Sequence, residues 1–305
     1  MNKLSIIIPS RDDRYLQKTI DDLIEKAVGE IEIIVVLDGY WPTTMVKDHP
    51  LVKIIHHGIQ FSNIGMRESI NRGVQLSNGN YIMKIDEHCL VSHGYDIGLI
   101  ADCEEHDVII PRRYRLSPDA WMIEEDGRAP VDYMHIDYAF QRINDKKCGL
   151  HGNIWKRKER AEILIDETPT MQGSCYFMPR KHWDEVLVEL DSDLYGNFTH
   201  EAQEISCKTW FTGGRVMVNK KVFYAHWHKG KKGRNYGFST QQYINHGKSM
   251  NEGRIFCREY WLNTKDYKYD WEWFMTKFPD MPGWGPNWRE NLKRDYELEE
   301  DKLKI

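Results

Sequence analysis

Apolar runs rich in β-branched residues alternate with amphipathic segments along the first 113 residues. The run LSIIIPS at 4–10 is typical of a buried strand, and within 12–28 the side chains of Leu16, Ile20 and Leu23 share one helical face. The same criteria predict further strands at 31–39, 52–57, 80–86 and 107–113, and a helix at 65–77. This alternation predicts a parallel sheet covered on both faces, with ligands bound at the carboxyl ends of its strands.

The periodicity fades between Tyr114 and Ile165 and returns afterwards. Beyond residue 236 the chain is aromatic and charged, and residues 288–305 have the pattern of a solvated helix. No low-complexity linker separates the two parts. We therefore expect a main α/β domain over 1–236 and a C-terminal helical extension over 237–305 that packs on it.

Composition narrows the class of protein. The chain of 305 residues is 41% hydrophobic and 29% charged, which is enough to bury a large core. No stretch approaches the roughly 20 apolar residues of a membrane span, and the six cysteines form no C-x-x-C pair. We expect a cytoplasmic protein with reduced thiols and no membrane partner. The formal net charge of −5 excludes a uniformly basic surface but leaves local basic patches open.

Two aspartates stand where predicted strands end. Asp38 follows IEIIVVL and Asp86 follows YIMKI, at the edge where an α/β sheet binds its ligands. The alternative is that each is a helix cap or a turn residue. Dinucleotide binding is disfavoured, because the first strand-to-helix turn, PSRDDRYLQ, has no glycine that would let a pyrophosphate approach the backbone.

Asp86 and His88 are spaced to serve one cation. If the strand continued through them, alternate residues would share a face and both side chains would point the same way. A carboxylate with an imidazole suits manganese or another borderline divalent ion better than calcium. A capping aspartate beside a surface histidine is the competing interpretation.

Three separated motifs resemble one enzyme family. The run Asp86 to Cys89 (DEHC), the run Pro169 to Phe177 (PTMQGSCYF) and the run His200 to Gly214 (HEAQEISCKTWFTGG) occur in the order found in the polypeptide N-acetylgalactosaminyltransferases. The chain also resembles, more loosely, the family 2 glycosyltransferases, which share the GT-A fold. The resemblance implies an α/β fold of the GT-A type, a mostly parallel sheet flanked by helices, and UDP-sugar-dependent glycosyltransferase activity.

The resemblance also assigns a metal site. It implies that Asp86, His88 and His226 bind a divalent cation such as Mn²⁺, which holds the diphosphate of the UDP-sugar. The metal would stabilise the negative charge of the departing diphosphate, so Asp86 is also a candidate catalytic residue.

Donor contacts are implied at three further positions. Asp38 would contact the uridine half of the donor, and Gly173 would give the sugar access to the backbone. Glu201, the second candidate catalytic residue, would lie beside the sugar hydroxyls or the reacting face.

The chain departs from the family at two places. Ile70 stands where the family has an arginine, and Arg67, one turn earlier on the same helical face, is expected to contact a phosphate or the sugar instead. The residue after Glu201 is Ala202, whereas inverting family 2 enzymes usually carry an aspartate base there. This favours a retaining mechanism, although Glu201 could itself act as the base.

A basic segment follows the proposed third ligand. HWHKGKKGRNYG at 226–237 resembles the family's segment that closes over the donor, so Lys229 is expected to meet the diphosphate. The further cations Lys231, Lys232 and Arg234, with the aromatic tail, suggest a polyanionic acceptor, specifically a hydroxymethylated pyrimidine in DNA. A protein or glycan hydroxyl is the alternative acceptor.

Two other functions compete with sugar transfer. A nucleotidyltransferase would need a glycine-rich loop after the first strand, which PSRDDRY does not provide. For a non-catalytic carbohydrate- or nucleic-acid-binding module, the aromatic tail is the best evidence.

Overall fold

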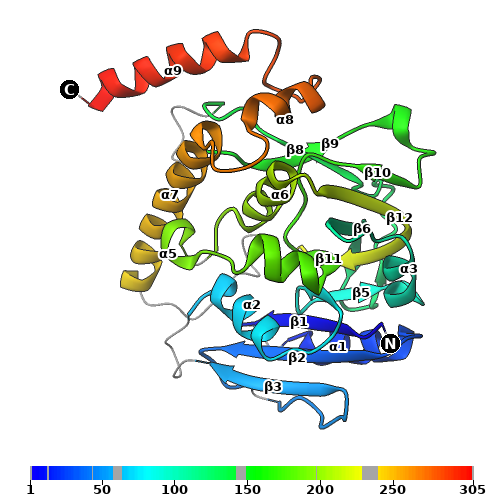
Figure 1. Ribbon diagram of the computed structural model, residues 1–305. Coiled ribbons are helices and arrows are strands. Elements are labelled where there is room, and N and C mark those ends of the chain that lie inside the picture. The colour runs from blue at the N-terminus through cyan, green and yellow to red at the C-terminus, as the bar shows by residue number, and fades with distance from the viewer. Residues whose placement is uncertain are drawn as a thin grey trace.

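The computed structural model describes residues 2–11, 14–42, 44–57, 64–141, 149–196, 198–228 and 240–303. A ten-stranded sheet runs through the molecule in the order β10-β12-β6-β11-β4-β1-β2-β3, with β5 paired to β12 and β7 paired to β6. Strands β8 and β9 form a separate antiparallel pair. In Figure 1, β3 lies at one edge of the molecule, and α8 and α9 lie at the opposite end.

The strands are β1 Leu4–Ser10, β2 Ile31–Asp38, β3 Val52–His57, β4 Tyr81–Ile85, β5 Cys89–Val91, β6 Asp107–Ser117, β7 Met122–Ile123, β8 Tyr133–Ile136, β9 Gly152–Trp155, β10 Ile165–Glu167, β11 Cys175–Pro179 and β12 Arg215–His226. The α-helices are α1 Leu16–Lys26, α2 Met66–Gln75, α3 Tyr95–Ala101, α4 Arg180–His182, α5 Ser192–Tyr195, α6 Glu201–Thr212, α7 Thr240–Asn263, α8 Trp271–Lys277 and α9 Trp288–Leu303. A 3-10 turn η1 spans Lys158–Arg160, and a π-helical turn η2 spans Trp183–Leu187.

Both faces of the sheet are buried, as the continuous apolar runs predict. On β1, Ile7 packs in the same core cluster as Ile70 of α2, whereas Ile6 and Ile8 pack on the opposite side with Ile20 of α1. This division follows from the alternation of side chains along a strand. The α/β fold with helices on both faces of the sheet is therefore confirmed.

Four strands differ from the simple parallel pattern, because β5, β7, β10 and β11 each pair antiparallel with their neighbours. Neighbours in β4-β1-β2-β3 are parallel, and so are β6 and β12. Between these two groups, β11 runs antiparallel to both β4 and β6. Strand β11 thereby brings the end of the 168–174 loop beside the end of β4, where Asp86 follows.

The C-terminal region shares the core of the main domain. Trp261, Trp271 and Trp284 are each at most 2% exposed and lie in one cluster with Trp210 and Phe211 of α6. These indoles stabilise the packing, so the expectation that the aromatic tail stacks a base is wrong for these three residues. The predicted boundary at residue 236 lies outside the described residues, and the division into two domains stays a prediction.

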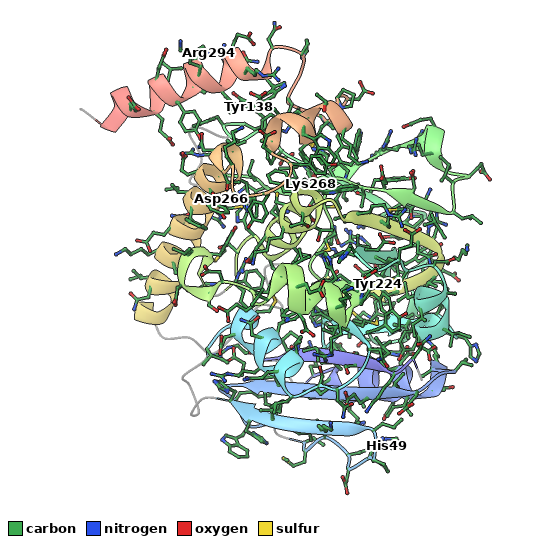
Figure 2. The ribbon with its side chains drawn as sticks, viewed as in Figure 1. His49, Tyr138, Tyr224, Asp266, Lys268 and Arg294 are labelled. Atoms are coloured by element: carbon green, nitrogen blue, oxygen red, sulfur yellow. The ribbon has the colours of Figure 1, made fainter. Side chains whose placement is uncertain are left out.

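Two hydrogen bonds connect the β8–β9 region to the C-terminal region, one to α9 and one to the turn between α8 and α9. The Tyr138 hydroxyl donates to Asp295 Oδ2 on α9 at 2.8 Å, and Trp284 Nε1 donates to the Ile136 carbonyl at 2.8 Å. Figure 2 shows Tyr138 beneath α9 and Tyr224 within the sheet. The C-terminal region therefore helps to hold the β8–β9 pair in place.

Within the described ranges, no helix is long and apolar enough to cross a membrane. Cys89, Cys103, Cys175, Cys207 and Cys257 are free thiols, and Cys148 lies outside the described residues.

Candidate active site

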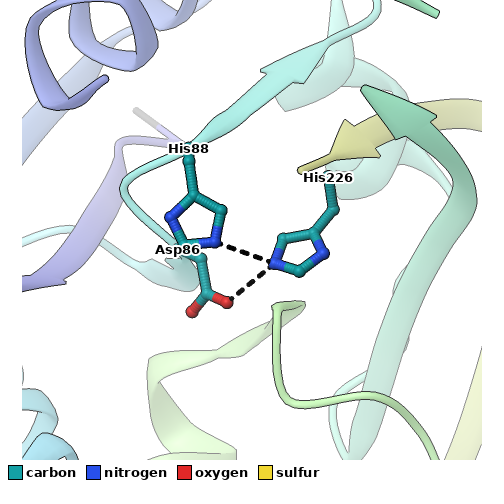
Figure 3. Close-up of side chains that lie close together, drawn as sticks. All are labelled: Asp86, His88 and His226. Carbon is teal, nitrogen blue, oxygen red and sulfur yellow. Dashed lines mark hydrogen bonds and ion pairs between the residues drawn. The ribbon is translucent and has the colours of Figure 1, made fainter. Parts of the chain in front are cut away.

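Asp86, His88 and His226 converge at the end of β4. His226 Nε2 lies 3.1 Å from His88 Nε2 and 3.2 Å from Asp86 Oδ2 (Figure 3). One ligand atom from each residue lies within 4.8 Å of the others. The structure thus brings together the three residues that the resemblance assigned to a metal.

The convergence arises from a turn and a strand pairing. Strand β4 ends at Ile85, so Asp86 and His88 lie in the turn before β5 and do not share the face of one strand. Strand β5 pairs antiparallel with β12, with Cys89 opposite His226, and the His88 carbonyl accepts a hydrogen bond from the Trp227 amide at 3.1 Å. The alternation argument for Asp86 and His88 was therefore wrong in its reason, although the two side chains do converge.

The three side chains fit a divalent cation. Neighbouring ligands of an octahedral ion at about 2.1 Å lie about 3 Å apart, and the spacings of 3.1 and 3.2 Å match this. One carboxylate oxygen and two imidazole nitrogens suit manganese, iron or zinc better than calcium. His88 and His226 are 8% and 9% exposed, so the position they enclose is largely shielded from solvent.

Lys84 keeps the Asp86 carboxylate ionised. Burial alone would raise the pKa of Asp86, but the Lys84 ammonium and the neighbouring imidazoles outweigh it, and the pKa is lowered overall. Lys84 Nζ donates to Asp86 Oδ1 at 2.7 Å. Burial likewise opposes the charge of Lys84, yet Asp86 and Glu201 raise its pKa overall. A charged ligand oxygen is thus available at neutral pH.

Gly173 and Glu201 lie against each other, next to this site. The Gly173 carbonyl accepts a hydrogen bond from Lys84, and Glu201 Oε1 lies 3.9 Å from Lys84 Nζ. A Cβ added at position 173 would lie only 2.9 Å from Glu201 Oε2, so glycine is what allows this approach. Burial raises the pKa of Glu201, which is 3% exposed. Their predicted roles toward the sugar stay predictions.

Asp38 closes the start of α2. Its carboxylate accepts hydrogen bonds from the backbone amides of Ile64 at 2.8 Å and Gly65 at 3.1 Å, and Gly65 is the N-cap residue directly before the helix. The capping interpretation therefore describes these contacts. Asp38 is 4% exposed, and burial raises its pKa. The predicted contact with uridine stays a prediction.

Arg67 does not face the site, which corrects the expected phosphate or sugar contact. The side chain is 0% exposed, and its guanidinium forms an ion pair with Glu204 of α6 and donates to the Thr199 carbonyl at 2.9 Å. Its neighbour on the same helical face, Ile70, is also 0% exposed. The face of α2 that the two residues share is packed against the core, so this arginine has a structural role.

Lys229 and the cations Lys231, Lys232 and Arg234 lie outside the described residues. The structure describes the chain as far as His228, whose Nε2 lies 3.0 Å from Arg113 Nη1.

Sequence reasoning missed Lys84. A signal was present, because this lysine interrupts the apolar run YIMKI of a buried strand. A charged residue in such a position is buried only with partners of opposite charge. It therefore pointed to carboxylates beneath the end of the strand.

Comparisons with known proteins bear on the family and the fold of the chain. The family model described as glycosyl transferase family 2 matches residues 5–187, which is more than half of the chain. Glycosyltransferase GlyA of Streptococcus pneumoniae serotype 4 is 23% identical over 171 residues, which cover 54% of this chain and 23% of GlyA. The matched family segment includes Asp86, His88 and Gly173 but ends before Glu201 and His226.

The solved structure of GalNAc-T7 shares the fold. GalNAc-T7, determined with UDP, GalNAc and Mn²⁺, superimposes with a TM-score of 0.56 at 18% identity, covering 81% of this chain and 48% of that one. Staphylococcus aureus TarS 1–349 with UDP-GlcNAc gives a TM-score of 0.46 at 13% identity, covering 77% of this chain and 61% of TarS. The chain thus spans about half of GalNAc-T7 and about a quarter of GlyA. It has the GT-A fold and belongs to glycosyl transferase family 2.

Proposed function

We propose that the protein transfers a sugar from a UDP-sugar to an acceptor hydroxyl with the help of a divalent cation, manganese in the first instance. The observation that carries the proposal is the convergence of Asp86, His88 and His226 within 4.8 Å at the end of β4. GalNAc-T7, which shares the fold, was solved with UDP and Mn²⁺. In this chain, Asp86, His88 and His226 would hold the ion.

The bound cation would act as a Lewis acid for the departing diphosphate. The chain supplies a site prepared for it. Asp86 remains ionised because Lys84 and His226 lower its pKa against the effect of burial. Gly173 and Glu201 border the same site, where they would orient the sugar, and Asp38 lies at the end of β2, where the uridine would bind.

Hydrolysis of UDP-sugars by the purified protein tests the proposal. We expect release of UDP from at least one member of a panel of UDP-glucose, UDP-galactose and their N-acetyl counterparts, dependent on added Mn²⁺. Asp86→Asn, His88→Ala and His226→Ala should each lower the rate by about 100-fold or more. His93→Ala, at an exposed histidine, is the matched control and should retain activity. Full activity in the three ligand variants after chelation would overturn the metal assignment.

We further propose retention of anomeric configuration. Position 202, where inverting family 2 enzymes usually carry an aspartate base, is an alanine that is 8% exposed. The neighbouring carboxylate of Glu201 is 3% exposed and burial raises its pKa, so Glu201 is the alternative base. An α-linked first product from an α-linked donor, observed by nuclear magnetic resonance, is expected. A β-linked product would show that Glu201 or another group serves as the base.

For the acceptor we propose a hydroxymethylated pyrimidine in DNA. Support comes from the sequence, which has Lys231, Lys232 and Arg234 directly after the proposed ligand His226. Neutralising these three residues together should weaken use of hydroxymethylated DNA and flatten its salt dependence, while hydrolysis of the donor persists. Transfer to a protein or glycan hydroxyl, with hydroxymethylated DNA ignored, would replace DNA by the alternative acceptor class.

A further inference from the structure

Lys84 lies beneath the candidate site and contacts three of its residues. Its ammonium donates to Asp86 Oδ1 at 2.7 Å and to the Gly173 carbonyl, and it lies 3.9 Å from Glu201 Oε1. These partners come from the end of β4, from the loop before β11 and from the first turn of α6. One side chain therefore joins the three segments that form the site.

Packing alone does not account for a lysine at this position. Lys84 is 1% exposed and lies in the sheet between Ile7 of β1 and Tyr176 of β11. Burying an ammonium costs several kcal/mol, and an apolar residue of similar volume is often as stabilising as a buried ion pair. The specific gain from the lysine is the orientation of the groups that it contacts.

The two oxygens of Asp86 have different partners. Oδ1 accepts from Lys84, whereas Oδ2 faces His226 Nε2 at 3.2 Å. With Oδ1 held, the carboxylate cannot rotate freely, and Oδ2 stays directed toward the histidines. The same ammonium fixes the Gly173 carbonyl, whose loop borders Glu201.

We propose that Lys84 is a positioning residue that holds Asp86 as a single-oxygen metal ligand and couples the metal site to the sugar-binding side at Gly173 and Glu201. This inference rests on the proposed function. Partners that orient metal ligands typically account for about 10- to 100-fold in metal affinity or activity. The lysine itself contacts neither metal nor sugar.

The test compares two buried lysines of the same sheet. Lys220 on β12 is 7% exposed and donates to the carbonyls of Arg160 at 2.6 Å and Ala161 at 3.3 Å, away from the candidate ligands. Lys84→Met and Lys220→Met therefore remove equivalent charges from the core. Binding of Mn²⁺ to the full chain is measured by the loss of the free-ion electron paramagnetic resonance signal, alongside thermal stability and UDP-sugar hydrolysis.

We expect Lys84→Met to bind Mn²⁺ about 10- to 100-fold more weakly than the unaltered protein and to lower kcat for donor hydrolysis by a similar factor. Lys220→Met should lose stability but bind Mn²⁺ with unchanged affinity. Lys84→Gln keeps N–H donors at this position and should recover part of the affinity. It also provides the measurement if Lys84→Met yields no folded protein.

The outcomes separate the two proposals. If the unaltered protein binds Mn²⁺ and hydrolyses a UDP-sugar, but the Lys84 variants bind Mn²⁺ within twofold of it, the positioning role is refuted and the proposed function stands. Equal loss of affinity in Lys220→Met would likewise reduce Lys84 to a structural role. If the unaltered protein binds no Mn²⁺ at all, the proposed function and this inference fall together.

Discussion

Replacing Arg67 by methionine distinguishes a structural arginine from one that binds the donor. In the structure its guanidinium pairs with Glu204, donates to the Thr199 carbonyl at 2.9 Å and to the Asp191 carbonyl at 3.2 Å, and lies 4.5 Å from the Tyr195 ring centroid. Methionine fills part of the volume but offers no donor. The variant would leave a buried carboxylate and two carbonyl groups with weaker partners.

The expected cost follows from burial. Glu204 is 0% exposed, and breaking a fully buried ion pair by removing one partner typically costs about 3–5 kcal/mol. Lys208 Nζ remains 2.8 Å from Glu204 Oε1 and retains part of the compensation, so we expect the lower end, about 3 kcal/mol. At about 2.1 cal/mol/K of unfolding entropy per residue, this corresponds to a fall in Tm of about 5 °C for 305 residues.

Thermal unfolding followed by circular dichroism measures this cost, and titration with UDP measures donor binding. The matched control is Arg72→Met on the same helix, because the Arg72 side chain is 46% exposed and its i,i+4 pair with Glu68 should contribute no more than about 0.5 kcal/mol. We expect Arg67→Met alone to lose stability while the folded fraction binds UDP normally. An unchanged Tm with a large loss of UDP affinity would refute the structural role and restore the predicted phosphate contact.

Three further predictions concern strain, acidity and the sugar side of the site. Val188 has φ 61° and ψ −57° and is 66% exposed, so Val188→Gly should raise the free energy of unfolding by about 1 kcal/mol in urea titrations; a loss would contradict the strain. Burial lowers the pKa of His182 from 6.5 to about 4. The contribution of the neutral imidazole to the free energy of unfolding is therefore complete above pH 6.5 and is lost as pH falls through 4. Between pH 6.5 and pH 4 the free energy of unfolding should therefore decrease by about 3 kcal/mol less in His182→Gln than in the unaltered protein. The same pH dependence of the free energy of unfolding in both proteins would contradict this. Gly173→Ala should displace Glu201 and lower UDP-sugar hydrolysis about tenfold or more with Tm retained, whereas the control Gly247→Ala, whose added Cβ meets no atom within 4 Å, should leave hydrolysis unchanged.

The strands and helices of residues 4–113 could be predicted because their apolar patterns are continuous and buried. Strands β1 and β3 occupy the residues predicted for them, and α2 covers Met66–Gln75 within the predicted 65–77. The antiparallel direction of β11 could not be predicted in the same way. Side-chain alternation has the same period in either direction, and only the partners across the sheet decide which one forms.

Arg67 illustrates what helical periodicity can and cannot predict. The spacing placed Arg67 and Ile70 correctly on one face of α2, but it did not reveal whether that face points to a ligand or to the core. The deciding partner, Glu204, is 137 residues away in sequence. A buried arginine next to a functional site has the same local pattern as a phosphate-binding one, so local reasoning assigned it the wrong role.

The position of His226 depends on an irregularity of β12 that the residue pattern does not reveal. Strand β12 pairs with β6 as far as Asn219 and resumes at Phe223, while β6 advances by one residue only, from Pro111 to Arg112. The three extra residues change which face of the sheet the following side chains point to. Met217 and Tyr224 are seven positions apart and would lie on opposite faces of a regular strand, yet they pack in the same cluster. His226 is two residues after Tyr224, so both side chains point to the same face. In a β12 without the bulge, the imidazole would point to the opposite face, away from Asp86 and His88. The candidate metal site therefore requires this bulge as much as it requires the histidine, and only the resemblance to a known family could anticipate His226.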